Sequence, residues 1–493
     1  MDRRDEVPRN KVPRNEIAQN GAPDDLLALL AELRAELGDA VRVDAESLDA
    51  ARADKSGQVS HTRPLAVVEA TTIEQVQATM RFATAHLVPV VPRGAGTGLA
   101  GGAIGGEGEL VLSTRGMDRI LEVSIDDQLA VVQPGVLNGD LNAQLAERGL
   151  WWAPDPASKA ISTIGGNIAT NAGGLLCAKY GVTREAVLGL KVVLADGRVI
   201  SMGHRSVKGV TGYDLTALMV GSEGTLGVVV EATLKLQPVP RGGVATISAA
   251  FPSVESAARA ASAIVARGIR PAIMELLDAS ALEAIGAFLE LDLGGRGAQL
   301  LIQTDGSGAE AEAEDAVAIV REHGGDAELT IDRGEGEKLF AIRRSFHPAM
   351  EARGTVLIED VAVPRSALPA MFAAIERIEA KYGISIPTVA HAGDGNLHPN
   401  FIFGEGGADA KEAEVPERIW AAADELFLDC LRLGGTLTGE HGIGILKKRW
   451  LRDELGDDGF ALQKQLKQVF DPLGILNPGK VFSGGPGSAL HAE

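Results

Sequence analysis

The sequence lacks the features that define several familiar protein classes. Only two cysteines, Cys177 and Cys430, occur in 493 residues, too few for a disulfide framework or an iron–sulfur cluster. No apolar run approaches the roughly 18 residues that span a bilayer. The charged N-terminus also lacks the apolar segment of a signal peptide. We therefore expect a cytoplasmic protein, and a peripheral position at the inner face of the membrane stays open.

Positive charge is also scarce. The chain carries 47 Lys and Arg against 67 Asp and Glu, a formal net charge of −20. Phosphate backbones are bound by clustered Lys and Arg, so no nucleic acid partner is expected. The same acidity disfavours direct electrostatic docking on an anionic membrane.

Glycine, in contrast, is abundant. It supplies 60 of the 493 residues, well above the usual share of ~7%. The glycines gather in short clusters between apolar segments and do not form a low-complexity linker. Such clusters are typical of backbone that approaches a ligand closely.

Hydrophobic patterning predicts two differently built regions. Residues 24–38 are predicted to form a short helix, and residues 64–91 a strand–helix–strand unit whose helix starts after Thr71 and Thr72. Further strands are expected at 187–201 and 226–237. Beyond Pro238, Ala- and Glu-rich helices alternate with strands, which favours an antiparallel sheet covered by helices on one face. The predicted helices of this second region span 253–267, 309–323, 368–382 and 416–433, and its strands 244–251, 299–304, 327–331, 355–363, 387–391 and 398–404.

The first glycine cluster matches the spacing GxGxxG at Gly96, Gly98 and Gly101. A dinucleotide-binding Rossmann unit requires a helix directly after this motif. More glycine and a strand follow here, so we reject that fold. Consecutive backbone N–H groups can instead surround a pyrophosphate, with Arg93 adding charge. A simple glycine-rich turn between strands is the alternative for this loop.

Two more clusters have similar chemistry. Residues 162–174 read STIGGNIATNAGG, and residues 221–227 read GSEGTLG. Hydroxyls, amides and bare backbone occur together in both. Three such loops in one region predict a single large polar ligand that crosses all of them.

The segment PTVAHAGDGNLHPNFIF, residues 387–403, predicts a β-hairpin. Asp-Gly is a preferred two-residue turn, and a turn at Asp394 and Gly395 would place His391 directly opposite His398. Cross-strand neighbours have Cβ atoms roughly 4.5–5.5 Å apart, which suits one divalent ion. Glu440 follows in a second glycine-rich turn and completes a three-ligand set with open positions. A surface hairpin that carries two histidines by chance is the alternative.

Taken together, these motifs resemble a known family. VPRGAGTGLAGGA, PDPASKAISTIGGNIATNAGG, GYDLTALMVGSEGTLGVV, HAGDGNLHP, TGEHGIG and LNPGK are similar to motifs of FAD-linked oxidases and dehydrogenases of the vanillyl-alcohol-oxidase type. Within these, the chain looks most like the D-2-hydroxyacid dehydrogenases, a group that acts on D-lactate, glycolate or D-2-hydroxyglutarate. The resemblance covers about residues 50–482.

The resemblance implies an α+β fold. It implies a PCMH-type FAD-binding domain of two α/β subdomains at 24–240, then a substrate (cap) domain with an antiparallel sheet at 241–430. A C-terminal segment at 431–482 would return to the FAD and close the active site. Residues 1–23 and 483–493 are expected to be disordered tails.

The resemblance also implies residue roles. His391, His398 and Glu440 would bind a divalent metal, Zn or Mn. Arg343 would bind the substrate carboxylate, although Arg344 beside it is not separated from it; Asn400 and His441 would also contact substrate. No histidine lies in residues 92–103, and attachment through His61 or His86, the alternative, has no supporting pattern, so we expect non-covalent FAD. Its expected contacts are Arg93, Gly94, Ala95, Gly96, Thr97, Gly98, Pro154, Asp155, Ser162, Thr163, Gly165, Gly166, Asn167, Thr170, Asn171, Gly173, Glu223, Gly224, Thr225 and Asn477.

These residues suit oxidation of a small 2-hydroxy acid to the 2-oxo acid, with D-lactate the first candidate and glycolate or D-2-hydroxyglutarate the alternatives. Flavin N5 can accept the hydride, a divalent ion can acidify the hydroxyl, and His441 is the candidate base. A metal-dependent hydrolase and a non-catalytic flavin subunit are the rival hypotheses. The electron acceptor, whether quinone, cytochrome, flavoprotein or oxygen, stays open, as does a homodimer.

Overall fold

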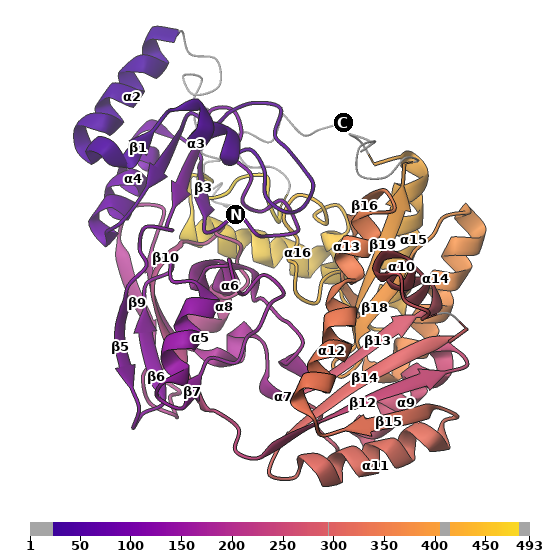
Figure 1. Ribbon diagram of the computed structural model, residues 1–493. Helices are drawn as coiled ribbons and strands as arrows, with labels where there is room; N and C mark the ends of the chain where they lie inside the picture. Colours follow the sequence, from indigo (N-terminus) through magenta and orange to yellow (C-terminus); the bar gives the residue numbers. More distant parts are fainter. Residues whose placement is uncertain (1–22, 294, 405–414, 483–493) are drawn as a thin grey trace, which may run out of the picture.

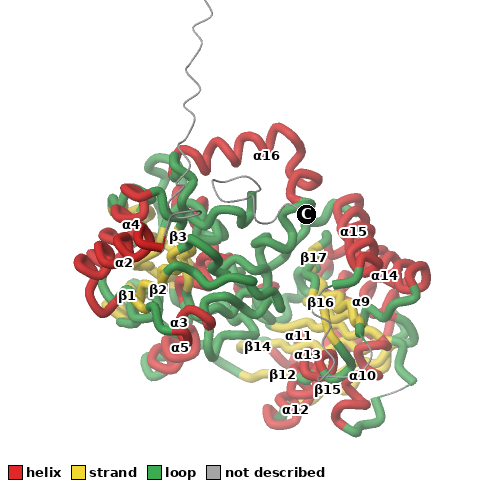
Figure 2. The backbone as a smooth tube through the Cα atoms, turned by 90° about the horizontal axis from the view of Figure 1, so that it is seen from above, coloured by secondary structure: helices red, strands yellow, loops and turns green. Residues whose placement is uncertain are grey.

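A computed structural model of the protein describes residues 23–293, 295–404 and 415–482 (Figure 1). The predicted tails lie outside the described residues, except for Pro23, which begins helix α2 (Pro23–Leu37). Two halves of different architecture face each other, and the C-terminal helix α16 (Leu451–Phe470) runs between them (Figures 1 and 2). Among the described residues, no helix is long and apolar enough to cross a membrane.

The first half begins with a four-stranded sheet in the order β1-β2-β4-β3. Its strands are β1 (Val41–Arg42), β2 (Ala66–Glu69), β3 (Val90–Arg93) and β4 (Leu110–Ser113). Helix α4 (Ile73–His86) connects β2 to β3 and begins after Thr72, whose hydroxyl accepts the N–H of Gln75. The predicted strand–helix–strand unit is confirmed. Its two strands both pair in parallel with β4, which lies between them.

The second sheet has the order β5-β6-β10-β8-β9 and is antiparallel throughout. Strands predicted at 187–201 and 226–237 are present as part of it. Helices α5, α6 and α8 pack on this sheet in one apolar cluster with Val132, Leu190 and Leu234. The elements are β5 (Ile120–Ser124), β6 (Leu129–Val132), α5 (Asn138–Ala146), α6 (Ile164–Thr170), β8 (Val187–Val193), β9 (Val199–Gly203), α8 (Leu215–Met219) and β10 (Val228–Lys235).

The second half is built on an antiparallel sheet, as predicted, in the order β15-β12-β14-β13-β18-β19-β16, with β17 also paired to β19. It has eight strands where six were predicted, because β13 was missed and the strand predicted at 355–363 is divided into β16 and β17. Its strands are β12 (Gly243–Phe251), β13 (Ile273–Asp278), β14 (Ala298–Gly306), β15 (Asp326–Thr330), β16 (Thr355–Ile358), β17 (Val361–Ala362), β18 (Thr388–His391) and β19 (Asn396–Phe403).

Helices cover both faces of this sheet, so the predicted one-sided cover is wrong. The four predicted helices, α9 (Val254–Ala266), α11 (Ala309–Glu322), α14 (Leu368–Tyr382) and α15 (Glu417–Arg432), share one apolar cluster. Helices α10 (Ala279–Leu289), α12 (Arg333–Arg344) and α13 (Phe346–Glu351) belong to another. The reason is visible in β13, where Met274 and Leu276 join the first cluster and Ile273 and Leu277 the second.

The C-terminal segment returns to the first half. After α16, the N–H of Asn477 donates to the carbonyl of Val90 at 2.7 Å, and the N–H of Val90 donates to Ile475 at 2.7 Å. The end of the chain is thereby paired to the edge strand β3. Short elements complete the described chain: η1 (Gly38–Ala40), α3 (Ala45–Ala50), β7 (Leu150–Trp151), α7 (Cys177–Tyr180), η2 (Thr183–Ala186), β11 (Gln237–Pro238) and η3 (Arg365–Ala367).

Candidate active site

A cavity of about 1970 Å³ is lined by residues from both halves. All three glycine clusters contribute to its wall, as do the hairpin β18–β19 and the turn at Glu440. The lining includes these residues predicted from the sequence: Arg93, Gly94, Ala95, Gly96, Thr97, Gly98, Asp155, Gly165, Gly166, Asn167, Thr170, Gly173, Glu223, Gly224, Arg343, His391, His398, Asn400, Glu440 and His441. The chain therefore brings the two groups of predicted residues to one space.

The hairpin has a different register from the predicted one. His391 pairs with Asn396 and His398 pairs with Val389, so the direct His391–His398 pairing is wrong. Residues 392–395 form the turn, in which the N–H groups of Asp394 and Gly395 both donate to the carbonyl of His391. The pairing is displaced by two residues, which keeps both histidines on one face of the sheet. Their ring centroids are 5.0 Å apart.

The two imidazoles converge on Glu440. Its Oε1 lies 3.2 Å from Nε2 of His398 and 3.7 Å from Nε2 of His391, and the three ligand atoms lie within 4.8 Å of one another. Burial alone would raise the pKa of Glu440, but His391 and His398 outweigh burial and hold that pKa well below its usual range. Two imidazoles and one carboxylate whose ligand atoms lie this close together form a donor set that fits a divalent ion.

His441 lies beside this group. Its ring stacks on that of His398 at a centroid distance of 5.1 Å, and its Nε2 is 3.7 Å from Oε1 of Glu440. Burial lowers the pKa of His441 to about 4, so the imidazole is neutral near pH 7. A neutral imidazole at the cavity wall has a lone pair with which to take a proton.

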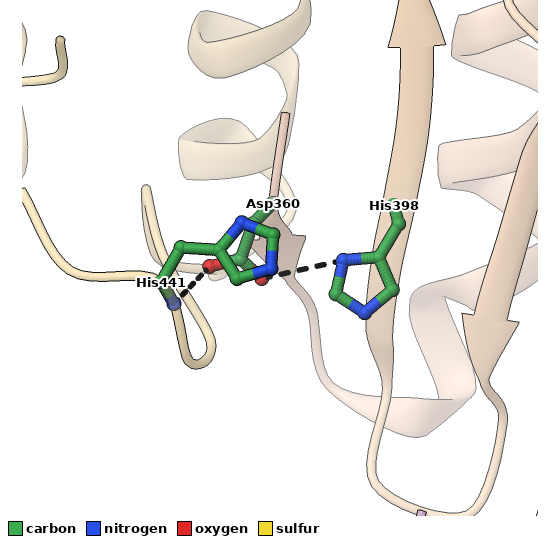
Figure 3. A group of neighbouring side chains, drawn as sticks. All are labelled: Asp360, His398 and His441. Carbon is green, nitrogen blue, oxygen red and sulfur yellow. Dashed lines mark hydrogen bonds and ion pairs between the residues drawn. The ribbon is translucent and has the colours of Figure 1, made fainter. Parts of the chain in front are cut away.

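Two buried carboxylates that sequence reasoning missed stand behind the histidines. Oε1 of Glu275 lies 2.5 Å from Nδ1 of His391. Oδ2 of Asp360 accepts the backbone N–H groups of Glu440 and His441 at 3.0 and 2.9 Å, and its Oδ1 faces Nδ1 of His398 at 4.0 Å (Figure 3). A signal was present, since Glu275 interrupts the apolar strand IMELLD and a buried charge requires a partner.

Both candidate arginines line the cavity, but they differ in burial and in their acidic partners. Arg343 lines the cavity, its side chain is 12% exposed, and its Nε donates to Oε2 of Glu275 at 2.8 Å. Arg344 pairs with Glu337 and is 51% exposed. Asn400 is buried, lines the cavity and donates from Nδ2 to the carbonyl of His398.

The glycine loops fit closely against each other and against the second half. A β-carbon on Gly94 would lie 2.4 Å from the Thr163 hydroxyl oxygen, and one on Gly173 would lie 2.6 Å from Oε2 of Glu440. A larger residue at either position would displace the side chain that it meets. Arg93 was expected to add charge to the first glycine loop. Its guanidinium already donates hydrogen bonds to three backbone carbonyls, those of Ala50, Ala53 and Ala103.

Several predicted cofactor contacts instead brace the loops. Nδ2 of Asn477 donates to the carbonyls of Gly102 and Glu223. The Glu223 carboxylate, whose pKa is raised to about 7 by burial, accepts the N–H groups of Ile443 and Gly444. The predicted residues outside the cavity lining are Pro154, Ser162, Thr163, Asn171, Thr225 and Asn477.

A large cavity bounded by three backbone-rich loops fits a dinucleotide-sized ligand, and comparison with known proteins identifies that ligand. Residues 64–203 match the FAD binding domain family, and residues 243–481 match the C-terminal domain of FAD linked oxidases. These matches define the class: the protein is an FAD-linked oxidoreductase.

Curated relatives narrow the class. The chain is 43% identical over 427 residues to the glycolate oxidase subunit GlcD of Bacillus subtilis, covering 85% of this chain and 89% of the relative. It is 36% identical over 418 residues to a D-lactate dehydrogenase of Archaeoglobus fulgidus, covering 84% and 90%. The chain belongs to the FAD-linked oxidase family that includes these enzymes.

Solved structures with less than 20% sequence identity to this chain share its fold. A substrate-bound p-cresol methylhydroxylase superposes with a TM-score of 0.75 at 17% identity, covering 96% of this chain and 98% of that one. A 4-ethylphenol oxidase from Gulosibacter chungangensis gives 0.73 at 16% identity, covering 94% and 98%. The expected PCMH-type fold is confirmed.

Proposed function

We propose that the protein oxidises a small D-2-hydroxy acid to the corresponding 2-oxo acid, with D-lactate the first candidate and glycolate and D-2-hydroxyglutarate the alternatives. One observation supports this most strongly. Glu440, His391 and His398 converge on the wall of the cavity that the three glycine loops also line. A substrate in that cavity could therefore touch an electron acceptor on one side and a cation site on the other.

The glycine loops would hold FAD without a covalent bond. When bound, FAD supplies a two-electron acceptor that no side chain can provide, taking hydride at N5. His391, His398 and Glu440 would hold a divalent ion, Zn or Mn, whose charge lowers the pKa of a bound hydroxyl. Imidazole ligands suit Zn and carboxylate ligands suit Mn, so this donor set fits either ion.

Side chains of this protein would supply the base and would bind the substrate. His441, neutral because burial lowers its pKa to about 4, would take the substrate hydroxyl proton at Nε2, the nitrogen that faces Glu440. Arg343 would orient the substrate carboxylate, because a guanidinium can bind a carboxylate through two N–H groups. Asn400 would add a hydrogen bond from the adjacent strand β19.

The charges around Arg343 favour a monocarboxylate. A diacid such as 2-hydroxyglutarate would need a second cation. Close to Arg343, Arg344 pairs with Glu337, and Nε2 of His347 lies 3.5 Å from Glu351. Arg343 also has an acidic partner, Glu275, but that pair uses only Nε and Nη2 and leaves Nη1 for one substrate carboxylate. The names of the relatives, a glycolate oxidase subunit and D-lactate dehydrogenases, are in line with a small monoacid.

A substrate panel tests this proposal. Initial rates with an artificial dye as acceptor should give the highest kcat/KM with D-lactate or glycolate, and a lower value with D-2-hydroxyglutarate. L-lactate should be a poor substrate. Arg343→Lys keeps the charge but loses the planar fork, so KM should rise with little change in kcat. Preference for the diacid, or an unchanged KM in the variant, would contradict the proposal.

Two other hypotheses are weaker. A metal-dependent hydrolase would leave the three glycine loops without a role. A non-catalytic flavin subunit would bind FAD but would not be reduced by any hydroxy acid. The physiological electron acceptor can be a quinone, a cytochrome, a flavoprotein or oxygen, and a homodimer is equally open.

A further inference from the structure

One fully buried carboxylate contacts both sides of the candidate site. Glu275 lies on strand β13 with 0% of its side chain exposed. Its Oε1 is 2.5 Å from Nδ1 of His391. Its Oε2 is 2.8 Å from both Nε and Nη2 of Arg343. The two partners come from different elements, β18 and α12, and from the two different roles proposed above.

We propose that Glu275 is a positioning residue shared by the metal site and the substrate-carboxylate site. It holds the His391 imidazole with Nε2 directed at Glu440, and it holds the Arg343 guanidinium at the cavity wall. This inference rests on the proposed function and deepens it, because one buried carboxylate links the proposed metal ligand His391 to the proposed carboxylate-binding residue Arg343.

The hydrogen-bond chemistry of imidazole supports the proposed effect of Glu275 on the metal site. A carboxylate that accepts from Nδ1–H fixes the tautomer in which Nε2 has the free lone pair. Metal-binding histidines usually have such a partner, and its removal typically weakens metal affinity ~10–100-fold. In this chain Nε2 of His391 lies 3.7 Å from Oε1 of Glu440, so the ring orientation that Glu275 enforces is the one that closes the ligand set.

The geometry of guanidinium supports the proposed effect of Glu275 on the site for the substrate carboxylate. Glu275 occupies one edge of the Arg343 fork, through Nε and Nη2. The remaining N–H groups are free to bind a carboxylate in the cavity that Arg343 lines. Without Glu275, Arg343 would lose its ion pair and keep, within the described residues, only the contact of its guanidinium with the Phe346 ring, 5.9 Å from the ring centroid. The effect expected on catalysis is thus a raised KM with a smaller change in kcat.

The second buried carboxylate behaves differently and provides a comparison. Asp360 faces His398 at 4.0 Å, but its other oxygen accepts two backbone N–H groups, and Nζ of Lys447 lies 3.8 Å away. It therefore supports the turn at Glu440, and it contacts no residue with a proposed role in binding the substrate carboxylate. Of these two buried carboxylates, Glu275 is the one that contacts both His391 and Arg343.

The test uses the FAD-loaded protein with its metal removed by dialysis. The Zn²⁺ dissociation constant is measured by competition with a chromophoric chelator, a readout independent of turnover. KM and kcat for the preferred 2-hydroxy acid are then measured at saturating Zn²⁺. The variants are Glu275→Gln, Glu275→Asp, Arg343→Lys and the double variant of Glu275→Gln with Arg343→Lys. Asp278→Asn is the matched control, since Asp278 is a partly buried carboxylate on the same strand that caps α10, and Asn is also a good cap.

Glu275→Gln should weaken Zn²⁺ binding ~10–100-fold and also raise KM. The double variant should have a KM no higher than the worse single variant, because both changes release the same guanidinium. Glu275→Asp, one methylene shorter, should show both defects in a milder form and covers the case in which Glu275→Gln does not fold. Asp278→Asn should show neither defect.

Zn²⁺ binding by Glu275→Gln equal to that of the wild type would overturn this inference alone. So would a changed Zn²⁺ affinity with an unchanged KM, or additive effects in the double variant. A wild-type protein that binds no Zn²⁺ and no Mn²⁺ would instead overturn the proposed metal site, and this inference with it.

Discussion

Gly173 of the second glycine loop lies so close to Glu440 that a β-carbon on it would be 2.6 Å from the carboxylate oxygen Oε2 and 3.1 Å from the Glu440 β-carbon. The two residues belong to opposite halves of the molecule. Their contact places a proposed metal ligand directly against the proposed flavin site.

This contact gives a first prediction. Gly173→Ala should push the Glu440 side chain away, because overpacking a tight contact typically costs 1–3 kcal/mol. Metal affinity should therefore fall roughly 5–150-fold, measured by chelator competition. Gly166→Ala is the control, since a β-carbon there meets only the Thr163 hydroxyl at 3.2 Å. Equal metal affinity in Gly173→Ala and the wild type would show that Glu440 is not held against the glycine loop.

The second prediction concerns the cofactor linkage. No histidine lies in residues 92–103, so FAD should be held by backbone and polar contacts alone. Acid precipitation of the purified protein should release about one FAD per chain into the supernatant, quantified by fluorescence after chromatography. Flavin that remains with the pellet would contradict non-covalent binding.

The third prediction concerns His441. Its change to Ala removes the proposed base, so the rate of flavin reduction should fall by the usual general-base factor of ~10²–10⁴. FAD and metal contents should both survive, since Glu440 and the glycine loops are untouched. Stopped-flow absorbance under anaerobic conditions measures the rate. Reduction at the wild-type rate would exclude His441 as the base, and a loss of metal would assign it to support of Glu440.

A fourth prediction concerns pH and stability. Glu359 is fully buried, neither of its carboxylate oxygens has a hydrogen-bond partner within the described residues, and Nζ of Lys447 lies 3.6 Å away. Burial raises the pKa of Glu359 from 4.5 to about 7. The folded state thus retains a proton that the unfolded state loses, and stability falls as pH rises from about 4.5 to about 7.

Glu359→Gln removes this titration and serves as the probe. Relative to the wild type, the variant should gain stability between pH 5 and pH 8, on the order of 3 kcal/mol at most. Melting temperatures of both proteins, measured across this range at constant ionic strength, report the difference. A gap between the two curves that does not change with pH would mean that Glu359 ionises normally in the fold.

Part of this site was predictable from the sequence because its chemistry is local. Glycine clusters and the residues His391, His398 and Glu440 stand out by type and spacing alone. The hairpin register did not, because it depends on a turn formed by residues 392–395 and not only on the Asp-Gly pair. The observed pairing is displaced by two residues from the predicted one, so both histidines still lie on one face of the sheet. Their proximity was therefore predicted correctly although the pairing was wrong.

The partners of Glu275 and Asp360 could not be predicted from the sequence. Each carboxylate acts through a partner far along the chain, and no local pattern states that β13 pairs with β18 or that Asp360 meets the turn at Glu440. The two-sided helix cover of the large sheet was missed for a similar reason, since strand β13 is buried on both faces.

We expect a D-2-hydroxy acid to reduce the flavin in a metal-dependent reaction. The most direct measurement mixes oxidised, metal-loaded protein with D-lactate or glycolate in the absence of oxygen and follows the visible flavin absorbance. Bleaching is expected in the metal-loaded protein, much more slowly with L-lactate, and not at all in a metal-stripped sample that still holds its FAD. Bleaching at the full rate in a verified metal-free sample, or no bleaching by any 2-hydroxy acid, would contradict this expectation.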